Sequence, residues 1–151
     1  MAGHRGRRRR DVAATALRRG AEAAEAAGVA GGVAWARADL AVTPPPARAF
    51  DLVSAQYFPF LRAGGGASVR GLLEAVAPGG TLLVVGHDVT GLSPGGGHGF
   101  DPADYYHPAD IARMLDGDWS VLVDETRPRV VPPPAGTRHT HDTVLLARRA
   151  G

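Results

Sequence analysis

The chain has 151 residues, of which 44% are hydrophobic and 21% charged, close to the averages of globular proteins. This is the length of one ordinary domain, and the absence of cysteine excludes a disulfide framework and a thiolate metal site. No apolar run reaches the roughly 18 residues of a membrane span, and no apolar stretch follows the basic N-terminus as in a signal peptide. A cytoplasmic protein with no membrane partner is therefore expected.

The positive charge is concentrated at the start of the chain. The formal net charge is +2, yet five of the arginines, Arg5 and those at 7–10, lie in the first ten residues. Residues 1–10 show no apolar periodicity and are predicted to form a disordered basic arm. Arginines without interleaved aromatic residues are a weak signal for nucleic-acid binding, so an inert tail is favoured over a nucleic-acid partner.

An alanine-rich helix is predicted after this arm. Asp11 can cap it, because a carboxylate accepts hydrogen bonds from exposed backbone N–H groups and complements the helix dipole. Residues 12–27 are good helix formers, and Gly28 ends the helix. Residues 33–37 then indicate a short strand that ends before Asp39.

The segment from Pro78 to Asp88 predicts the central strand of a sheet. Pro78 presets φ for a tight turn, and Gly79 can take the positive φ that the next position needs. Residues 81–85 form an unbroken apolar run, which is typical of a strand covered on both faces of a parallel sheet. The alternative interpretation is that Pro-Gly-Gly before an apolar run marks an ordinary β-hairpin. In an open α/β sheet, ligands bind beyond the carboxyl ends of strands, here at His87 and Asp88.

The other predicted elements complete an α/β layout. Gly91 to Gly99 is predicted to be a mobile loop of the kind that often covers a site. The last two strands are joined by a loop, so they should form an antiparallel hairpin at the sheet edge. The predicted elements are a strand at 50–55, a helix at 67–76, a helix at 107–117, and strands at 119–123 and 141–147.

Polar residues follow three of the predicted strands: Asp39, then Ser54 and Gln56, then His87 and Asp88. A carboxylate at a strand end suits ribose hydroxyls or an adenine amino group, because both donate and an ionised carboxylate only accepts. Each residue also has a plainer interpretation: a turn at Asp39, a helix cap at Gln56, a half-buried histidine at 87. Taken together, the positions favour a site.

These residues resemble the class I S-adenosylmethionine-dependent methyltransferases, in particular the small bacterial ones. The resemblance runs from Asp11 to the C-terminus and rests on residues 37–40, 50–54 and 73–82 and on the closing hairpin. It implies a Rossmann-like, mostly parallel sheet with a C-terminal antiparallel hairpin. It also implies S-adenosylmethionine as cofactor and methyl transfer to a small-molecule acceptor, which the sequence does not name.

The resemblance also assigns site residues. Asp39 is implied to bind the adenine amino group, with Leu40 against the ring, and Asp11 to bind the ribose hydroxyls. Residues 54–57 lie beside the methionine moiety and the substrate. The implied cofactor residues are Asp11, Asp39, Leu40, Ser54, Ala55 and Gln56.

Two residues are implied to act on the substrate, Tyr57 and His87. Methyl transfer is an in-line displacement from a sulfonium, so alignment and desolvation can suffice and a general base is optional. His87 is the candidate for that base. The aromatic residues Tyr57, Phe58 and Phe60 would suit a planar or apolar molecule, although a core position is slightly preferred for them.

The first strand and the glycine-rich loop of the family should precede Asp11, where only ten mostly basic residues stand. Residues 11–151 are therefore expected to be a truncated, partial methyltransferase domain, through a misplaced start or a frameshift near Arg10, that is inactive or binds cofactor poorly. Two empty strand positions would then separate the strand at 33–37 from the strand at 50–55. Either the strand at 33–37 is unpaired, or the sheet closes up and moves Asp39, or another chain fills the gap.

Two other functions fit the sequence less well. A non-catalytic binding or regulatory module could contact a partner chain through the open sheet edge. A metal site could use His139 and His141 on one strand face, but this spacing is common by chance, so no metal is expected.

Overall fold

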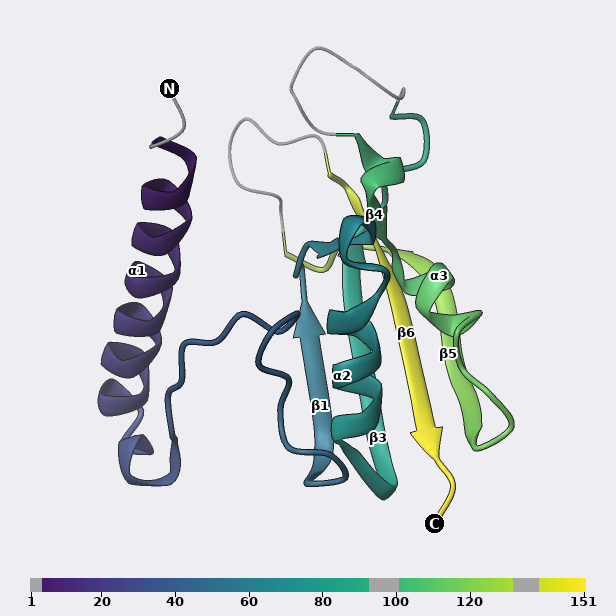
Figure 1. Cartoon of the computed structure of the whole chain (residues 1–151), viewed down its shortest axis with the longest axis horizontal. Coiled ribbons are helices and arrows are strands. Elements are labelled where there is room, and N and C mark those ends of the chain that lie inside the picture. Colours follow the sequence, from purple (N-terminus) through teal and green to yellow (C-terminus); the bar gives the residue numbers. More distant parts are fainter. Residues whose placement is uncertain (1–3, 93–100, 132–138) are drawn as a thin grey trace. The chain divides into compact units, whose positions relative to one another are not determined.

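The computed structural model describes residues 4–92, 101–131 and 139–151, with side chains described from Ala14 onwards (Figure 1). Two compact units divide the chain, Met1–Asp39 and Leu40–Gly151. No helix among the described residues is long and apolar enough to cross a membrane.

The first unit contains a long helix, α1, over His4–Ala26. It begins seven residues before Asp11, so the predicted cap at Asp11 is corrected: Asp11 lies inside the helix, as do residues 4–10, which were expected to be irregular. Arginine is among the best helix formers, and five of the seven residues before Asp11 in this helix are arginine. The predicted end is confirmed, because Gly28 has φ of +70°.

The predicted strand at 33–37 is wrong, because these residues form no strand and pair with no strand among those described. Trp35 packs on α1 instead. A Cβ placed on Gly20 would lie 2.5 Å from Cη2 of Trp35, so the absence of a side chain at Gly20 makes room for the indole. Backbone groups of an extended segment need a neighbouring strand, and this unit offers none.

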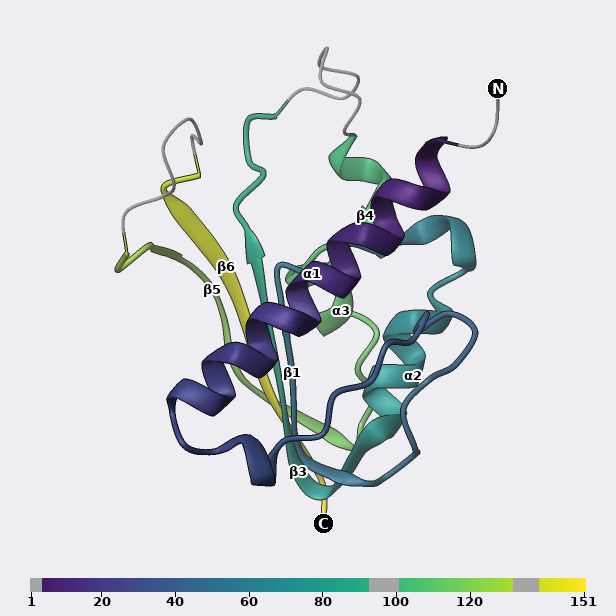
Figure 2. The same cartoon turned by 90° about the vertical axis from the view of Figure 1, so that its left-hand side faces the viewer.

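The second unit is built on a four-stranded sheet in the order β1-β3-β6-β5. Figure 2 shows these strands side by side. They are β1 (Phe50–Gln56), β3 (Val76–His87), β6 (His141–Arg149) and β5 (Trp119–Pro128).

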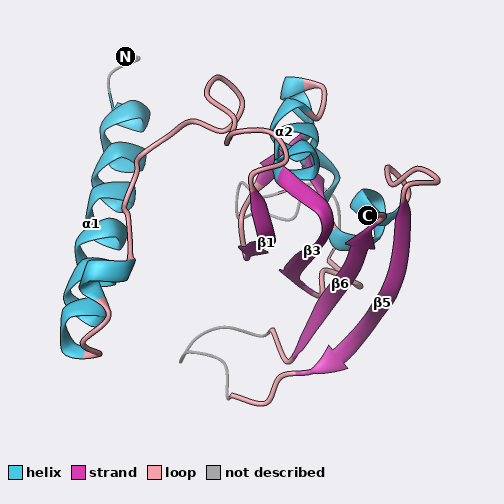
Figure 3. Cartoon of the chain, turned by 90° about the horizontal axis from the view of Figure 1, so that it is seen from below, coloured by secondary structure: helices cyan, strands magenta, loops and turns pink. Residues whose placement is uncertain are grey.

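The predicted central strand and closing hairpin are both confirmed. β3 has neighbours on both sides, and β5 and β6 pair antiparallel with β5 at the edge. The mostly parallel sheet is corrected to a mixed one: β1 and β3 are parallel, but β3 and β6 are antiparallel (Figure 3). The hairpin supplies two of the four strands of this sheet, so its direction sets two of the three pairings in it.

The turn at the start of β3 follows the prediction from its sequence. Gly79 has φ of +73°, and its N–H donates to the carbonyl of Ala150 at 3.1 Å. At Gly80 a Cβ would lie 2.8 Å from the carbonyl oxygen of Ala77, which only glycine avoids. The parallel register with β1 shifts between Phe50 and Leu52, which pair with Val76 and Thr81, so the extra residues lie on β3, at this turn.

The core lies between one face of the sheet and two helices, α2 (Ala67–Ala75) and α3 (Pro108–Ala112). Both helices were predicted, α3 as a longer one. Alternate residues of β3 and β6 face this core, as the period of two in a strand requires. The largest fully buried side chains are Phe60, Leu82, Ile111, Leu145, Val69 and Val76.

A two-stranded ribbon that the sequence did not predict joins these layers. Its strands are β2 (Phe60–Leu61) and β4 (Tyr105–Tyr106), paired antiparallel. Arg62 fixes it, because its guanidinium donates to Asp110 Oδ2 at 2.6 Å and to the Tyr105 carbonyl at 3.0 Å. The predicted mobile loop at 91–99 lies outside the described residues from position 93 onwards.

Candidate functional site

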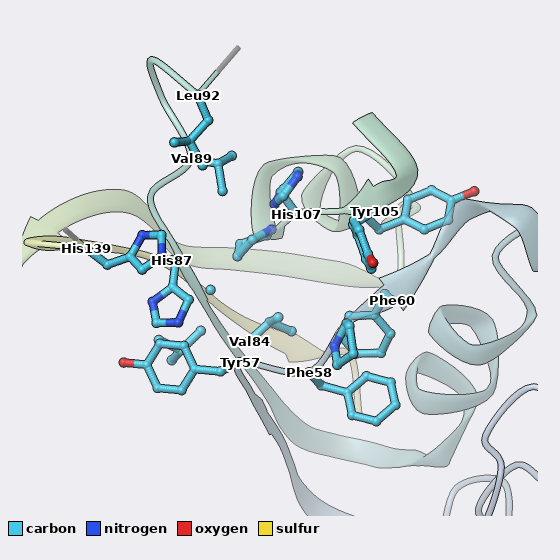
Figure 4. Close-up of a pocket in the computed structure, with 15 residues that line it drawn as sticks. Tyr57, Phe58, Phe60, Val84, His87, Val89, Leu92, Tyr105, His107 and His139 are labelled. Atoms are coloured by element: carbon cyan, nitrogen blue, oxygen red, sulfur yellow. The ribbon is translucent and has the colours of Figure 1, made fainter. Parts of the chain in front are cut away.

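A cavity of about 710 Å³ opens at the carboxyl ends of the parallel strands β1 and β3 (Figure 4). Val84 to His87 of β3 and Tyr57, directly after β1, line it together with the β2–β4 ribbon and the start of α3. This is the edge at which an open α/β sheet binds its ligands. The structure thus brings Tyr57 and His87 into one cavity.

Rings dominate the cavity wall. The aromatic side chains that line it are Tyr57, Phe58, Phe60, Tyr105 and Tyr106, and the imidazoles are His87, His107 and His139. Phe58 and Phe60 lie with ring centroids 4.8 Å apart. Among the described lining residues, none is Asp, Glu or Arg. Phe60 is both core and wall, being 2% exposed, whereas Phe58 is 44% exposed.

His87 lies between two other rings. Its imidazole stacks on Tyr57 with centroids 4.5 Å apart, and on His139 with centroids 4.3 Å apart and planes 11° from parallel. Stacking on both faces restricts the ring to one orientation, so His87 presents its edges rather than its faces to its surroundings.

Asp142 lies beside this stack. It is directly opposite His87 in the antiparallel register of β3 and β6. Its Oδ2 accepts a hydrogen bond from the Tyr57 hydroxyl at 2.9 Å and lies 3.5 Å from Nε of Arg129. Its Oδ1 lies 3.6 Å from Nδ1 of His87, and these two buried atoms have no hydrogen-bond partner of their own.

This geometry sets the proton positions on His87. Burial lowers the pKa of His87 and neighbouring His139 and Arg129 lower it further, against the opposing effect of Asp142, so the ring is neutral at pH 7. Because Nδ1 faces a carboxylate oxygen, the proton of the neutral ring belongs on Nδ1. Nε2 is then an acceptor. The side chain is 36% exposed although Nδ1 is buried, so its opposite edge is the accessible one.

Tyr57 holds the stack through an unusual backbone conformation. Its φ is +55°, in the left-handed region that non-glycine residues seldom adopt. Its N–H donates to the carbonyl of Val85 at 2.8 Å, which continues the β1–β3 ladder by one bond. Burial and the hydrogen bond to Asp142 raise the pKa of Tyr57, so its hydroxyl keeps its proton. Such conformations persist where surrounding structure imposes them, and they concentrate at functional sites.

His107 has a structural role. It precedes α3, its backbone N–H donates to Asp110 Oδ2 at 2.9 Å, and its ring Nε2 lies 2.8 Å from the carbonyl oxygen of Pro102. The side chain is therefore committed to positioning the start of α3.

The predicted cofactor residues are divided between the two units. Ser54 and Gln56 lie exposed at the end of β1, where the Gln56 amide donates to Ser54 Oγ at 3.3 Å. Ala55 points into the core at 8% exposure, which leaves only its backbone for a ligand. Leu40 is half-buried and begins the second unit. Asp11 and Asp39 belong to the first unit.

Three residues beside Tyr57 and His87 were not predicted as part of this site from the sequence: Asp142, Arg129 and His139. The segment from His139 to Asp142 was considered only as a metal-binding pattern. No group of three or more potential metal-binding side chains occurs among the described residues. His141 instead starts β6, with Nδ1 3.0 Å from Thr140 Oγ1.

Comparison with known proteins finds solved structures that share the fold of this chain. No protein family and no curated sequence matches this chain. The [4+2]-cyclase SpnF is similar with a TM-score of 0.58 and 15% identity, over 89% of this chain and 62% of SpnF. A possible exported protein from Bordetella parapertussis gives 0.51 and 17%, over 87% of this chain and 49% of that one.

The N-methyltransferase NodS from Bradyrhizobium japonicum WM9 gives a lower TM-score of 0.46 at 13% identity, over 81% of this chain and 64% of NodS. This chain thus spans between half and two thirds of the length of the proteins it matches. The likeness to SpnF shows the fold alone, an α/β arrangement shared over most of this chain.

Proposed function

We propose that this chain takes part in S-adenosylmethionine-dependent methyl transfer, and that its cavity binds a small-molecule acceptor. One observation carries the proposal: an apolar, ring-lined cavity of about 710 Å³ lies at the carboxyl ends of adjacent parallel strands, in a chain whose sequence resembles the class I methyltransferases. Its size and lining are those of small-molecule sites, which are mostly apolar with a few placed polar groups.

The residues at the end of β1 fit one end of the cofactor. Ser54 Oγ and the Gln56 amide are exposed polar groups beside the cavity residue Tyr57, and would hold the amino-acid end of S-adenosylmethionine. Leu40, which begins the same unit, is proposed to pack against the adenine ring. When bound, the cofactor supplies a methyl group on a positively charged sulfur.

The chain's own residues would align the acceptor and take its proton. The ring-lined wall excludes water and holds a flat molecule in one orientation, which alone contributes much of the rate in such displacements. Nε2 of His87 accepts the proton that leaves the acceptor's nucleophilic atom as its bond to the methyl carbon forms. A positioned base of this kind contributes typically about 10²–10⁴-fold.

Thermal unfolding with and without S-adenosylhomocysteine tests the proposal. A ligand that binds only the folded chain must raise the midpoint. We expect a rise that is reduced in Gln56→Ala and unchanged in the control Ser120→Ala, an exposed position on β5. A cooperative transition that does not move at millimolar ligand would contradict the proposal.

A second candidate function rests on β1. Among the described strands, β1 pairs with β3 alone, and Phe50 and Leu52 are 42% and 59% exposed. An unpaired edge is a template for another strand. We propose, as the alternative, a binding module that contacts a partner chain there. Size-exclusion chromatography with light scattering distinguishes the two candidate functions. A monomer that captures no partner would argue against the binding module.

A further inference from the structure

We infer that the cavity selects a neutral, flat aromatic molecule with a hydroxyl group, which donates its hydrogen bond to Nε2 of His87. The inference rests on the proposed function in treating the cavity as the acceptor site, and it names the class of acceptor.

The charge of the wall favours a neutral ligand. No described residue that lines the cavity carries a carboxylate or a guanidinium. The charged groups next to lining residues are paired with one another: Asp142 and Arg129 lie 3.5 Å apart beside Tyr57, and Arg62 and Asp110 lie 2.6 Å apart beside Tyr106 and His107. A charged ligand would lose its hydration without gaining an opposite charge, which is costly.

The shape of the wall favours a flat ligand. The rings of Phe58, Tyr105 and Tyr106 come from two segments that are distant in sequence, and they line the same cavity as Tyr57 and His87. Aromatic rings gain most from offset stacking or edge-to-face contact with another ring. A planar aromatic molecule makes these contacts with little loss of its own conformational entropy.

The hydrogen-bonding groups favour a donor on that ligand. Tyr57 is engaged by Asp142, and His107 by the carbonyl of Pro102. Of the other lining side chains, Tyr105 and Tyr106 carry hydroxyls that donate as well as accept, whereas the stacked imidazoles of His87 and His139 offer ring nitrogens as acceptors. Of these, His87 has its tautomer set by Asp142, 3.6 Å from Nδ1. Its accessible edge therefore offers one lone pair at a fixed place, and a hydroxyl is the neutral group that matches it.

Binding of three matched probes to the full chain, without cofactor, tests this inference at neutral pH. The probes are naphthol, its methyl ether methoxynaphthalene, and the anion naphthoate, each titrated against the chain by NMR. We expect naphthol to bind about tenfold more tightly than the ether, the difference that one hydrogen bond makes. Naphthoate should bind most weakly. The largest shifts should fall on the amides of Tyr57 and His87.

A pair of variants identifies the accepting residue. His87→Phe keeps a ring in the stack but removes the acceptor, so naphthol and its ether should bind equally. His141→Phe, at an exposed histidine that does not line the cavity, should keep the preference. Equal binding of naphthol and ether to the unmodified chain would overturn the inference, as would shifts elsewhere or no binding of any probe.

The probe-binding test and the test of the proposed function can fail separately. Selective naphthol binding together with no response to S-adenosylhomocysteine would overturn methyl transfer and support this ligand class. A midpoint raised by S-adenosylhomocysteine without any preference for naphthol would support methyl transfer and overturn this inference alone.

Discussion

The middle of β3 and β6 and the cavity end of the same strands follow opposite rules. In the middle, Leu82 and Leu145 are at most 1% exposed and belong to the apolar core. A few residues along, the same two strands carry His87 and Asp142, a partly buried ionisable pair with one buried, unsatisfied atom on each partner. Next to this pair, Tyr57 has a left-handed backbone.

The difference shows where this fold departs from local preferences. The core follows them, with alternating apolar residues and helices that cover one face of the sheet, except at the buried Arg149, whose guanidinium donates to the carbonyls of Leu73 and Val76. Strained backbone and incompletely paired polar groups cost roughly 1–3 kcal/mol each and persist only when their surroundings impose them. Local rules are commonly broken at functional sites, and beside the cavity both a left-handed residue and an incompletely paired polar pair occur.

The largest effect should come from the core. Leu145→Ala is expected to lower the free energy of unfolding by about 2–5 kcal/mol, because it removes buried methyl groups and leaves a void. Leu122→Ala, the same change at a 57% exposed position on β5, should cost less than about 0.5 kcal/mol. Urea unfolding measures both. Similar losses in the two variants would contradict the assignment of this core.

The next effect should come from Asp142→Asn at the cavity. It removes the charge that faces His87 and Arg129 and weakens the hydrogen bond from Tyr57, with an expected loss of about 1–3 kcal/mol. Because Asp142 raises the pKa of His87, that pKa should fall further. An NMR titration of the imidazole measures it. The control Asp124→Asn, at an exposed position on β5, should leave the pKa of His87 unchanged. If that pKa does not move in Asp142→Asn either, Asp142 and His87 do not interact.

A smaller effect is expected for Tyr57→Phe. The ring and its stacking on His87 are kept, and only the 2.9 Å hydrogen bond to Asp142 is lost, which should cost about 1 kcal/mol. Unfolding in urea gives the loss. A double-mutant cycle with Asp142→Asn should give less than the sum of the two single losses, and strict additivity would show that the two groups do not interact.

The smallest effect is a pH dependence. The pKa of His87 is lower in the folded chain than its ordinary value of 6.5, so the unfolded chain binds more protons between the two values. The stability contributed by neutral His87 is complete above pH 6.5 and declines as pH falls toward the folded pKa. Unfolding curves between pH 7 and pH 5 should show this decline, and His87→Phe should flatten it. A slope identical in the variant would assign the dependence to other groups.

Local patterns predicted most of the second unit. The apolar run before His87 gave the central strand, the alternating residues near the C-terminus gave the hairpin, and Gly79 has the positive φ that its turn requires. The wrong predictions concern which segments pair with one another. Residues 33–37 were predicted to form a strand, but a strand forms only beside a neighbouring strand, and Trp35 packs against Gly20 instead.

The site divides in the same way. Tyr57 and His87 could be named from the sequence because each follows a predicted strand, and ligands bind beyond strand ends. Asp142 could not, since it lies 85 residues from Tyr57 and becomes its partner only through the register of β6 on β3. Register is fixed by burying the alternate apolar residues of both strands at once. The sequence by itself therefore determined the strands and their ends, and only the tertiary structure decided which side chains meet there.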